Sequence, residues 1–184
     1  MLRPTPGALS SQRLEERPAN LPTQLYVCGG RPVSRFSAVV LEPDGPRLVG
    51  LDNPEDLQGL REQGFPIWLR VCGLSESQRI GRFLAMVDVP DTLLPPLLES
   101  PQRPRVNCFG DALLVVLHRL SFAHDPSHLV SSQVGLLLLP NLLISFEEVS
   151  IGEAFPELTS WLYSRFAAPE HQDLDDILHF LIDE

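Results

Sequence analysis

The stretch that decides the fold is Pro-Gln-Arg-Pro-Arg-Val-Asn-Cys-Phe-Gly-Asp-Ala-Leu-Leu-Val-Val-Leu-His-Arg-Leu, residues 101–120. Its prolines at 101 and 104 fix φ and favour extended backbone in the residues before them, so a preceding helix must end here. Residues 107–111, with Gly110 among them, predict a hairpin turn or a bulge. Residues 112–120 are almost continuously apolar, which predicts a central strand covered on both faces.

Strands and helices are predicted on both sides of this stretch. Apolar runs bounded by turn residues predict strands at 25–28, 36–41, 47–51, 66–72, 130–139 and 142–146. Helical spacing and start signals predict helices at 53–63, 91–99, 153–166 and 173–184, and another behind a Ser75-Glu76-Ser77-Gln78 capping box. The expected buried stripes are Ile80, Phe83, Leu84 and Val87 in that helix, and Leu174, Ile177, Leu178 and Leu181 in the last.

Length and composition indicate one globular domain. The chain has 184 residues, 43% of them hydrophobic and 21% charged, which is enough for a sizeable core but few for two domains. Residues 1–22 are rich in proline and lack sustained periodicity, so we expect a flexible tail there. Residues 23–184 are then the single domain.

The charge is unevenly distributed. All 14 basic residues are arginines, and the net charge is -10. Residues 1–35 carry five Arg and two Glu, or +3, which leaves nine Arg and 22 acids, or -13, for the rest. An acidic body argues against nucleic-acid binding, which needs a basic face, and favours neutral, basic or cationic partners.

The cysteines and the apolar runs indicate a soluble chain from a reducing compartment. Cys28, Cys72 and Cys108 are scattered singly, and without a nearby His or a paired Cys they are expected to be small core residues with no nucleophilic role. No apolar run resembles a signal peptide. The longest, residues 134–146, is broken by Pro140 and falls short of the roughly 20 residues of a membrane-spanning helix.

Signatures of enzyme chemistry are absent from the sequence. It contains no Walker loop, no GxGxxG after a strand, no HExxH and no GxSxG, so we predict that the protein is not an enzyme. His118, His124 and His128 could bring imidazoles together for zinc, which is the basis of an alternative hypothesis of a small metal enzyme. The competing interpretation is a strand-end histidine followed by two loop histidines.

Two further groups of polar residues are candidates for ion binding. Asp176, His179 and Asp183 share one face of the last predicted helix, which suits either a divalent ion or a solvated or subunit-facing polar surface. We favour the polar surface because the apolar stripe marks the opposite face as core. The pairs Glu147-Glu148 and Asp88 with Asp91 are interpreted as ordinary strand-end and helix-start acids.

Five short segments occur in an order that resembles a known family. They are Trp68-Leu69-Arg70-Val71-Cys72-Gly73, Gln102-Arg103-Pro104-Arg105-Val106, Leu113-Leu114-Val115-Val116-Leu117, Ser132-Gln133-Val134 and Leu143-Ile144-Ser145-Phe146-Glu147. In that order they resemble the N-terminal cytoplasmic domain of CorA-type magnesium and cobalt transporters. Residues 176–183 resemble the start of that family's next helical segment, and the similarity covers about residues 36–184.

The resemblance implies a mixed β-sheet sandwiched between helical layers, an α/β fold, in a protein that assembles as a homopentamer. In that family a long helix leaves the domain toward two membrane helices and a Gly-Met-Asn signature at the pore. The chain ends about where that helix would start, so we expect an excised, soluble domain at the cytoplasmic face of the membrane that cannot conduct ions alone. Divalent cations such as magnesium are the implied partners, as regulator or transported ion, and no cofactor is expected.

The sequence departs from the family at one regulatory position. Family members commonly carry Leu-Glu-Asp just before the Gln-Arg-Pro turn, and the aspartate contributes to a divalent-ion site between subunits. The aligned acids are here Pro95 and Pro96, which offer no ligand, and Glu99 one turn onward is a weak substitute. We therefore predict no metal site there. The leading hypothesis is a regulatory domain of a divalent-cation transporter, and the alternatives are a zinc-transporter relative or a stand-alone soluble interaction module of the same fold.

Overall fold

The structure, a computed structural model, describes residues 33–99, 102–122, 129–148, 162 and 173–183. Its described strands form one mixed sheet in the order β2-β1-β3-β7-β6-β5-β4. Neighbouring strands are antiparallel except for β3 and β7, which run parallel. The strands are β1 (Arg35–Glu42), β2 (Gly45–Leu51), β3 (Ile67–Cys72), β4 (Arg105–Phe109), β5 (Ala112–Phe122), β6 (Leu129–Leu139) and β7 (Leu142–Glu147).

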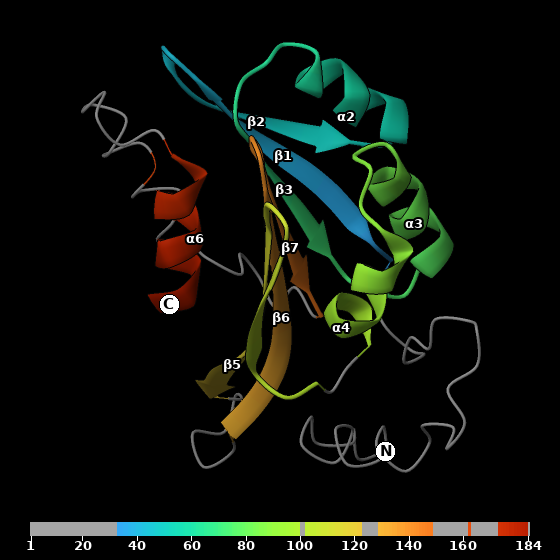
Figure 1. Cartoon of the computed structure of the whole chain (residues 1–184), viewed down its shortest axis with the longest axis vertical. Helices are drawn as coiled ribbons and strands as arrows, with labels where there is room; N and C mark the ends of the chain where they lie inside the picture. The colour runs from blue at the N-terminus through green and yellow to red at the C-terminus, as the bar shows by residue number, and fades with distance from the viewer. Residues whose placement is uncertain (1–32, 100–101, 123–128, 149–161, 163–172, 184) are drawn as a thin grey trace.

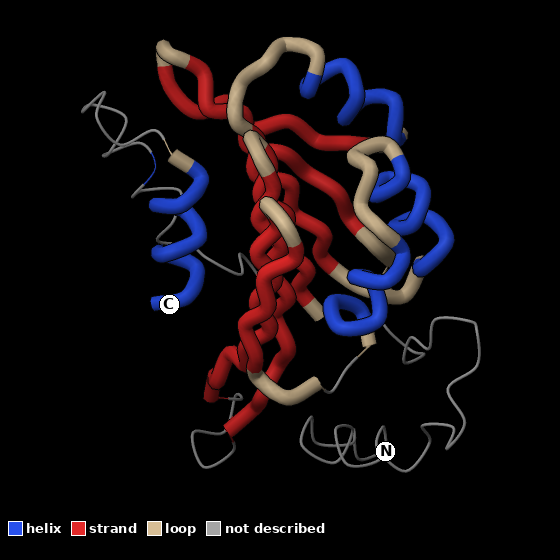
Figure 2. The backbone as a smooth tube through the Cα atoms, viewed as in Figure 1, coloured by secondary structure: helices blue, strands red, loops and turns tan. Residues whose placement is uncertain are grey.

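Helices cover both faces of the sheet (Figures 1 and 2). One face carries α2 (Pro54–Arg61), α3 (Ser77–Ala85), the short 3-10 helix η1 (Asp91–Leu93) and α4 (Leu94–Leu98). The other face carries α6 (Leu174–Asp183). The predicted α/β class, a mixed sheet sandwiched between helical layers, is confirmed.

Each face of the sheet has its own hydrophobic core. The larger core joins sheet residues such as Leu69 and Ile144 to apolar side chains of α2, α3 and α4. Phe36 of β1 stacks on Phe83 of α3 with ring centroids 3.9 Å apart. The smaller core packs α6 against Trp68, Leu143 and their neighbours. Both predicted helical stripes are buried in these cores, which confirms them: Ile80, Phe83, Leu84 and Val87, and Leu174, Ile177, Leu178 and Leu181.

The start of α3 differs from the prediction, whereas that of α2 agrees with it. At α2 the Asp56 carboxylate accepts a hydrogen bond of 3.0 Å from the N–H of Asn53, and Pro54 occupies the first turn. The capping box predicted at Ser75–Gln78 is wrong, because α3 begins at Ser77 and its N-cap, Glu76, makes no capping hydrogen bond. The Glu76 carboxylate instead accepts a 2.9 Å hydrogen bond from the N–H of Ser34.

The structure after residue 104 agrees only in part with the prediction from the sequence. Residues 105–109 form a strand, β4, and the turn is limited to Gly110, with φ of 59°, and Asp111. The turn or bulge predicted over 107–111 is therefore wrong in extent. A strand exposed on both faces has no buried side to create an apolar alternation, so its sequence gave no signal. Strand β5 lies second from the edge rather than at the centre, and it is deeply buried only near Leu114–Val116.

The other described elements agree with the sequence. The hairpin of β6 and β7 turns at Pro140-Asn141, where Asn141 adopts φ of 58°. Helix α4 tolerates Pro95 and Pro96 because they stand in its first turn, where the missing N–H groups have no intrahelical partner. The predicted tail at 1–22, strand at 25–28 and helix at 153–166 lie outside the described residues, apart from buried Leu162.

Candidate functional site

The sequence segments that carry the family resemblance meet in two polar networks, one on each face of the sheet. We call them the arginine network, built from the first and fifth segments, and the glutamine network, built from the second and fourth. In both networks, side chains bond across large separations in the sequence: to other side chains in the arginine network, and to backbone groups in the glutamine network. Four of the five segments therefore contribute bonds that connect distant parts of the chain.

The arginine network lies on the face that α6 covers. The Arg70 guanidinium of β3 donates to both carboxylate oxygens of Glu147 on β7, over 3.1–3.2 Å. Trp68, two residues before Arg70, donates its ring N–H to the Ser145 hydroxyl at 3.1 Å, and Arg70 lies 5.2 Å from the Trp68 ring. These side-chain bonds connect β3 and β7 in addition to the backbone pairing of the two strands.

Burial raises the pKa values of two groups in and beside the arginine network, Glu147 and Cys72. Glu147 is only 2% exposed, and this desolvation raises the pKa of its carboxyl, while Arg70 acts in the opposite direction. Burial, and next the Glu147 carboxylate, raises the pKa of the Cys72 thiol to about 12. At this pKa the thiol is protonated at neutral pH, and the lack of a nucleophilic role stays a prediction.

The glutamine network lies on the opposite face and holds the segment that joins α4 to β4. Gln133 of β6 is 1% exposed, and its side-chain carbonyl accepts a 2.7 Å hydrogen bond from the N–H of Gln102. Its amide N–H group donates to the carbonyls of Leu97 and Glu99 at 3.5 and 3.3 Å. One neutral side chain thus satisfies three backbone groups of the connecting segment.

Histidine 118 belongs to the glutamine network. Its Nε2 lies 2.7 Å from the carbonyl oxygen of Gln102 and its Nδ1 lies 3.1 Å from the Ser131 hydroxyl. A carbonyl only accepts, so Nε2 carries the proton and Nδ1 accepts from the hydroxyl in the neutral ring. His118 is mid-strand and bonded at both nitrogens, so it is neither the strand-end residue that we expected nor available to zinc in this arrangement. His124 and His128 lie outside the described residues.

Two glycines near the networks occupy positions that favour glycine, one through a close approach and one through its backbone conformation. A Cβ added at Gly135 of β6 would lie 3.0–3.3 Å from atoms of Leu97, so α4 packs directly on the strand backbone. Gly73, which ends the first segment, adopts φ of 84° and donates its N–H to the carbonyl of Glu147 at 2.9 Å. The left-handed backbone at Gly73 favours glycine.

The family's regulatory position is part of the helix–sheet contact. Pro95 and Pro96 form the first turn of α4, and Glu99 directly after the helix is 5% exposed, with its carbonyl bonded to Gln133. Over the described ranges, no three His, Cys, Asp or Glu side chains converge in a way that could hold a metal ion. The absence of a regulatory metal site stays a prediction, which titration can test.

The remaining candidate residues lie either at the exposed surface or buried within the fold. On α6, His179 pairs with Asp183 at 3.1 Å with both side chains more than two thirds exposed, as a polar helix face predicts. Asp91 starts η1 as expected, but Glu147 and Glu148 are buried rather than ordinary strand-end acids. Cys108 is exposed on β4, so its assignment to the core is wrong. Edge position, which local sequence does not reveal, explains this error.

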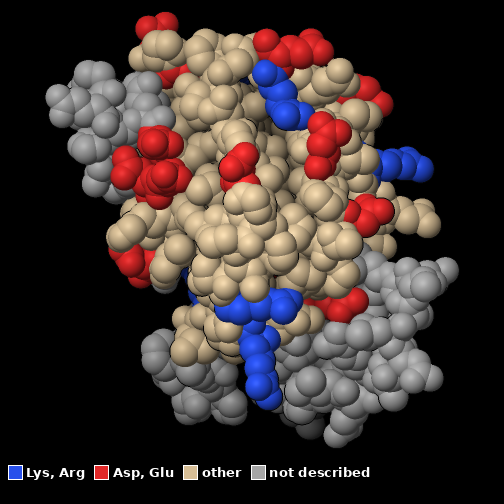
Figure 3. Space-filling model, in the orientation of Figure 1, with Lys and Arg blue, Asp and Glu red and all other residues tan. Residues whose placement is uncertain are grey.

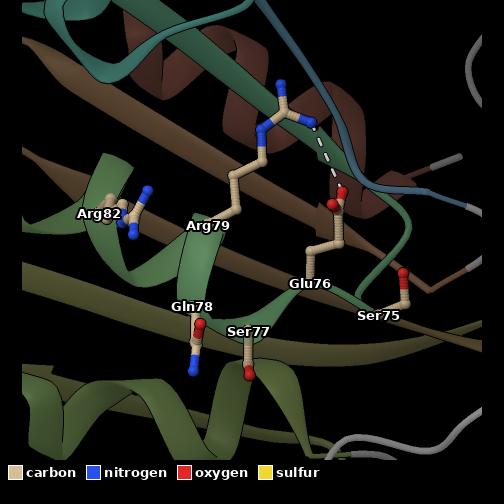
Figure 4. Close-up of a pocket in the computed structure, with 6 residues that line it drawn as sticks. All are labelled: Ser75, Glu76, Ser77, Gln78, Arg79 and Arg82. Atoms are coloured by element: carbon tan, nitrogen blue, oxygen red, sulfur yellow. Dashed lines mark hydrogen bonds and ion pairs between the residues drawn. The ribbon is translucent and has the colours of Figure 1, made fainter.

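Two of the cavities in the described part of the molecule open at its surface. The larger, about 500 Å³, lies at the start of α3 and is lined by Ser75, Glu76, Ser77, Gln78, Arg79 and Arg82 (Figure 4). Arg79 points toward Glu76, their closest atoms being 3.5 Å apart, and donates to the carbonyls of Ser34 and Asp52. This arginine anchors the start of β1 rather than reaching for a ligand.

The smaller cavity, about 240 Å³, lies beside the β6–β7 turn. Its lining includes Asp111, Asp173 and Asp175. Figure 3 shows separate clusters of acidic side chains distributed over the face in view, with basic side chains both near its upper end and toward its lower end. None of the described helices is long and apolar enough to cross a membrane.

Comparisons with known proteins agree with the segment-based resemblance. The cobalt/magnesium transport protein CorA of Thermotoga maritima is 26% identical over 132 residues, which are 70% of this chain and 36% of that protein. The chain thus spans about a third of the length of this curated relative. No family model matches the chain.

A solved structure of another protein shares the fold. The full-length CmaX protein has a TM-score of 0.51 at 17% identity, over 71% of this chain and 39% of its own. The ZntB cytoplasmic domain from Vibrio parahaemolyticus has a TM-score of 0.49 at 13% identity, over 72% and 49% of the two chains. The resemblance to a CorA-type cytoplasmic domain, inferred from five short segments, is confirmed by the CorA match.

Proposed function

We propose that this chain is the cytoplasmic regulatory domain of a divalent metal cation transporter of the magnesium and cobalt class. The observation that carries the proposal is the similarity to the Thermotoga maritima cobalt/magnesium transport protein over 132 residues. The arginine and glutamine networks are consistent with it, because four of the five segments that resemble the family contribute residues to these networks.

The domain would act by coupling rather than by conducting ions. Hydrogen bonds across β3–β7 and between α4 and β6 hold the sandwich together as one body. In a homopentamer, divalent ions that bridge the acidic faces of neighbouring bodies would change their packing and so bias the pore between closed and open arrangements. The charge of -13 outside residues 1–35 suits such bridging.

Uptake by the whole protein tests this function. The gene that encodes the chain is expressed in a bacterial strain without its own magnesium uptake systems, and the entry of magnesium, cobalt and zinc is measured separately. We expect magnesium or cobalt entry that responds to the internal concentration of the ion. Entry of zinc alone would favour the zinc-transporter alternative, and absence of any uptake by protein present in the membrane would overturn the proposal.

Magnesium titration tests the departure at the regulatory position. Because Pro95 and Pro96 offer no ligand and Glu99 is buried, we expect isothermal titration of this domain with magnesium to show no stoichiometric site there. A saturable site that Glu99→Gln abolishes, in a variant that keeps its thermal unfolding midpoint, would contradict this expectation.

A further inference from the structure

Strand β7 ends just before a residue that the β6–β7 ladder would still pair. The hairpin closes with Leu139 opposite Leu142 across a two-residue turn. In the same register Gln133 comes opposite Glu148, one pair beyond the end of β7. A closing pair exchanges two hydrogen bonds, and such pairs alternate along an antiparallel ladder. A continued ladder would therefore join the backbones of Gln133 and Glu148 by two bonds.

The backbone makes one bond of that pair, and a side chain makes the other. The N–H of Glu148 donates to the backbone carbonyl of Gln133 at 3.3 Å. The N–H of Gln133 donates to the Oε2 atom of the Glu148 carboxylate at 3.1 Å. Glu148 is buried, and the backbone bends at this residue. The carboxylate thus takes the position of a backbone acceptor where the chain leaves the sheet, a point that we call the β7 exit.

The side chain of Gln133 holds a second point of departure, which we call the α4 exit (Leu97, Glu99 and Gln102). It accepts a hydrogen bond of 2.7 Å from the N–H of Gln102. It donates to the carbonyls of Leu97 and Glu99 at 3.5 and 3.3 Å. One buried residue of β6 is therefore bonded to both exits, to the β7 exit through its backbone and to the α4 exit through its side chain.

We propose that Gln133 and the Glu148 carboxylate couple the two exits, so that they open and close as one unit. Hydrogen bonds weaken steeply as their geometry is lost, so a shift of the Gln133 backbone would be passed to its side-chain partners. The packing beside them supports the same coupling. A Cβ added at Gly135 would lie 3.0–3.3 Å from atoms of Leu97, so no side-chain layer separates α4 from β6 to absorb such a shift.

For the transporter role the coupling supplies a route for a signal, a step that rests on the proposed function. Helix α4 begins with Pro95 and Pro96, at the position of the family's regulatory acids. From the β7 exit the chain continues toward α6. A displacement of α4 would reach the chain that leaves the sheet through Gln133, without a metal ligand on α4 itself.

Amide hydrogen exchange, followed by NMR in the purified chain, tests the coupling. Glu148→Ala removes the acceptor of the Gln133 N–H. We expect the exchange of that N–H and of the Gln102 N–H to become at least roughly tenfold faster. Glu148→Gln keeps a side-chain oxygen at the same reach, so both rates should stay within about threefold of the wild type.

Two references separate coupling from a general loss of stability. The N–H of Ile80, which donates to the carbonyl of Glu76 at 2.9 Å, should exchange at the wild-type rate in each variant. The matched control is Glu42→Ala. Glu42 is also a strand-end glutamate that accepts a hydrogen bond, but it lies at the opposite end of the sheet, so its loss should leave the exchange of Gln102 unchanged.

A variant of Gln133 tests the coupling from the other side. Gln133→Met keeps the length of the side chain and removes its bonds to the α4 exit, but it leaves the backbone groups that bond to Glu148 in place. Because coupling is reciprocal, the N–H of Glu148 should exchange at least roughly tenfold faster. An unchanged rate there, an unchanged rate at Gln102 in Glu148→Ala, or an equal rise at Ile80 would overturn the proposal.

Failure of the coupling and failure of the transporter role are separate results. Exchange rates that do not respond as expected would overturn the coupling and leave ion uptake by the whole protein as the test of function. Absence of uptake would remove the signalling role and leave the coupling of the two exits intact.

Discussion

The arginine and glutamine networks both connect distant segments of the chain, but the first uses charged groups and the second a neutral amide. Both join segments far apart in sequence through buried polar side chains, but one uses an ion pair between β3 and β7 and the other a neutral amide between β6 and the α4–β4 segment. Removal of one partner from a buried ion pair leaves an uncompensated charge, which lowers stability strongly. Removal of a buried amide leaves several neutral backbone groups without a hydrogen bond, which lowers stability less. The two networks should therefore fail differently.

The largest expected effect comes from breaking the ion pair. Arg70→Leu leaves the carboxylate of Glu147 buried without its guanidinium, which should lower the free energy of unfolding by about 3–5 kcal/mol at pH 7. The double variant Arg70→Leu/Glu147→Leu removes the orphaned charge and should recover most of the loss. Urea unfolding measures both, and a double variant no more stable than the single one would contradict the account.

Breaking the amide network should cost less. Gln133→Leu keeps the volume but leaves the N–H of Gln102 and the carbonyls of Leu97 and Glu99 without their partner. We expect a loss of about 2–3 kcal/mol, also measured by urea unfolding. The exposed Gln78→Leu is the matched control and should stay within about 0.5 kcal/mol of the wild type. Equal losses in the two variants would rule out a special role for Gln133.

The close approach beside the amide network gives a smaller effect. Gly135→Ala forces a methyl group to within 3.0–3.3 Å of Leu97, including its backbone, so we expect thermal melting to show destabilisation of about 1–3 kcal/mol. Gly81→Ala, in α3 with nothing within 4 Å of its added Cβ, should be neutral or gain up to about 1 kcal/mol. If Gly135→Ala is neutral too, α4 is not held against β6 as described.

The smallest effect is a pH dependence that belongs to the arginine network. Burial raises the pKa of Glu147 in the folded state above its unfolded value of about 4.3. As the pH falls through the folded pKa, the native state takes up a proton before the unfolded state does, so the contribution of Glu147 to stability rises.

Comparison of wild type with Glu147→Gln isolates this pH dependence. The difference in unfolding free energy between them, measured from pH 7 downward toward 4.3, should shift in favour of the wild type. A shift in the opposite direction would mean that Arg70, rather than burial, dominates the titration of Glu147. The amide of Gln133 does not titrate, so the same comparison with Gln133→Leu should show no such trend.

Elements with a buried face were predictable from the sequence. The stripe Leu174–Leu181 located α6 because a helix that packs on a sheet must repeat its apolar residues at helical spacing. Strand β4 gave no such signal because both of its faces are exposed, and its exposed Cys108 was placed in the core for the same reason.

The networks were less accessible to sequence reasoning than the elements. The family segments pointed to Arg70, Gln133 and Glu147, but neither their burial nor their partners could be derived from composition or spacing. A polar side chain shows its role only when its partner, some 30 to 80 positions away, is brought beside it. Glutamate 147 therefore looked like an ordinary residue at the end of a strand.

The single parallel pairing between described strands has a consequence for how the chain folds. Strand β1 pairs with both β2 and β3, and β4 to β7 form successive hairpins, so the pairings within each half of the sheet join strands that are closer in sequence than β3 and β7. The halves meet only where β3 pairs with β7, at a separation of 75 residues between Ile67 and Leu142. During synthesis, the edge of β3 that pairs with β7 stays unpaired until β7 has left the ribosome. Because long-range pairing slows folding, we expect the joining of these halves to be the slow step and the interval before it to be the one in which the chain is most prone to aggregation.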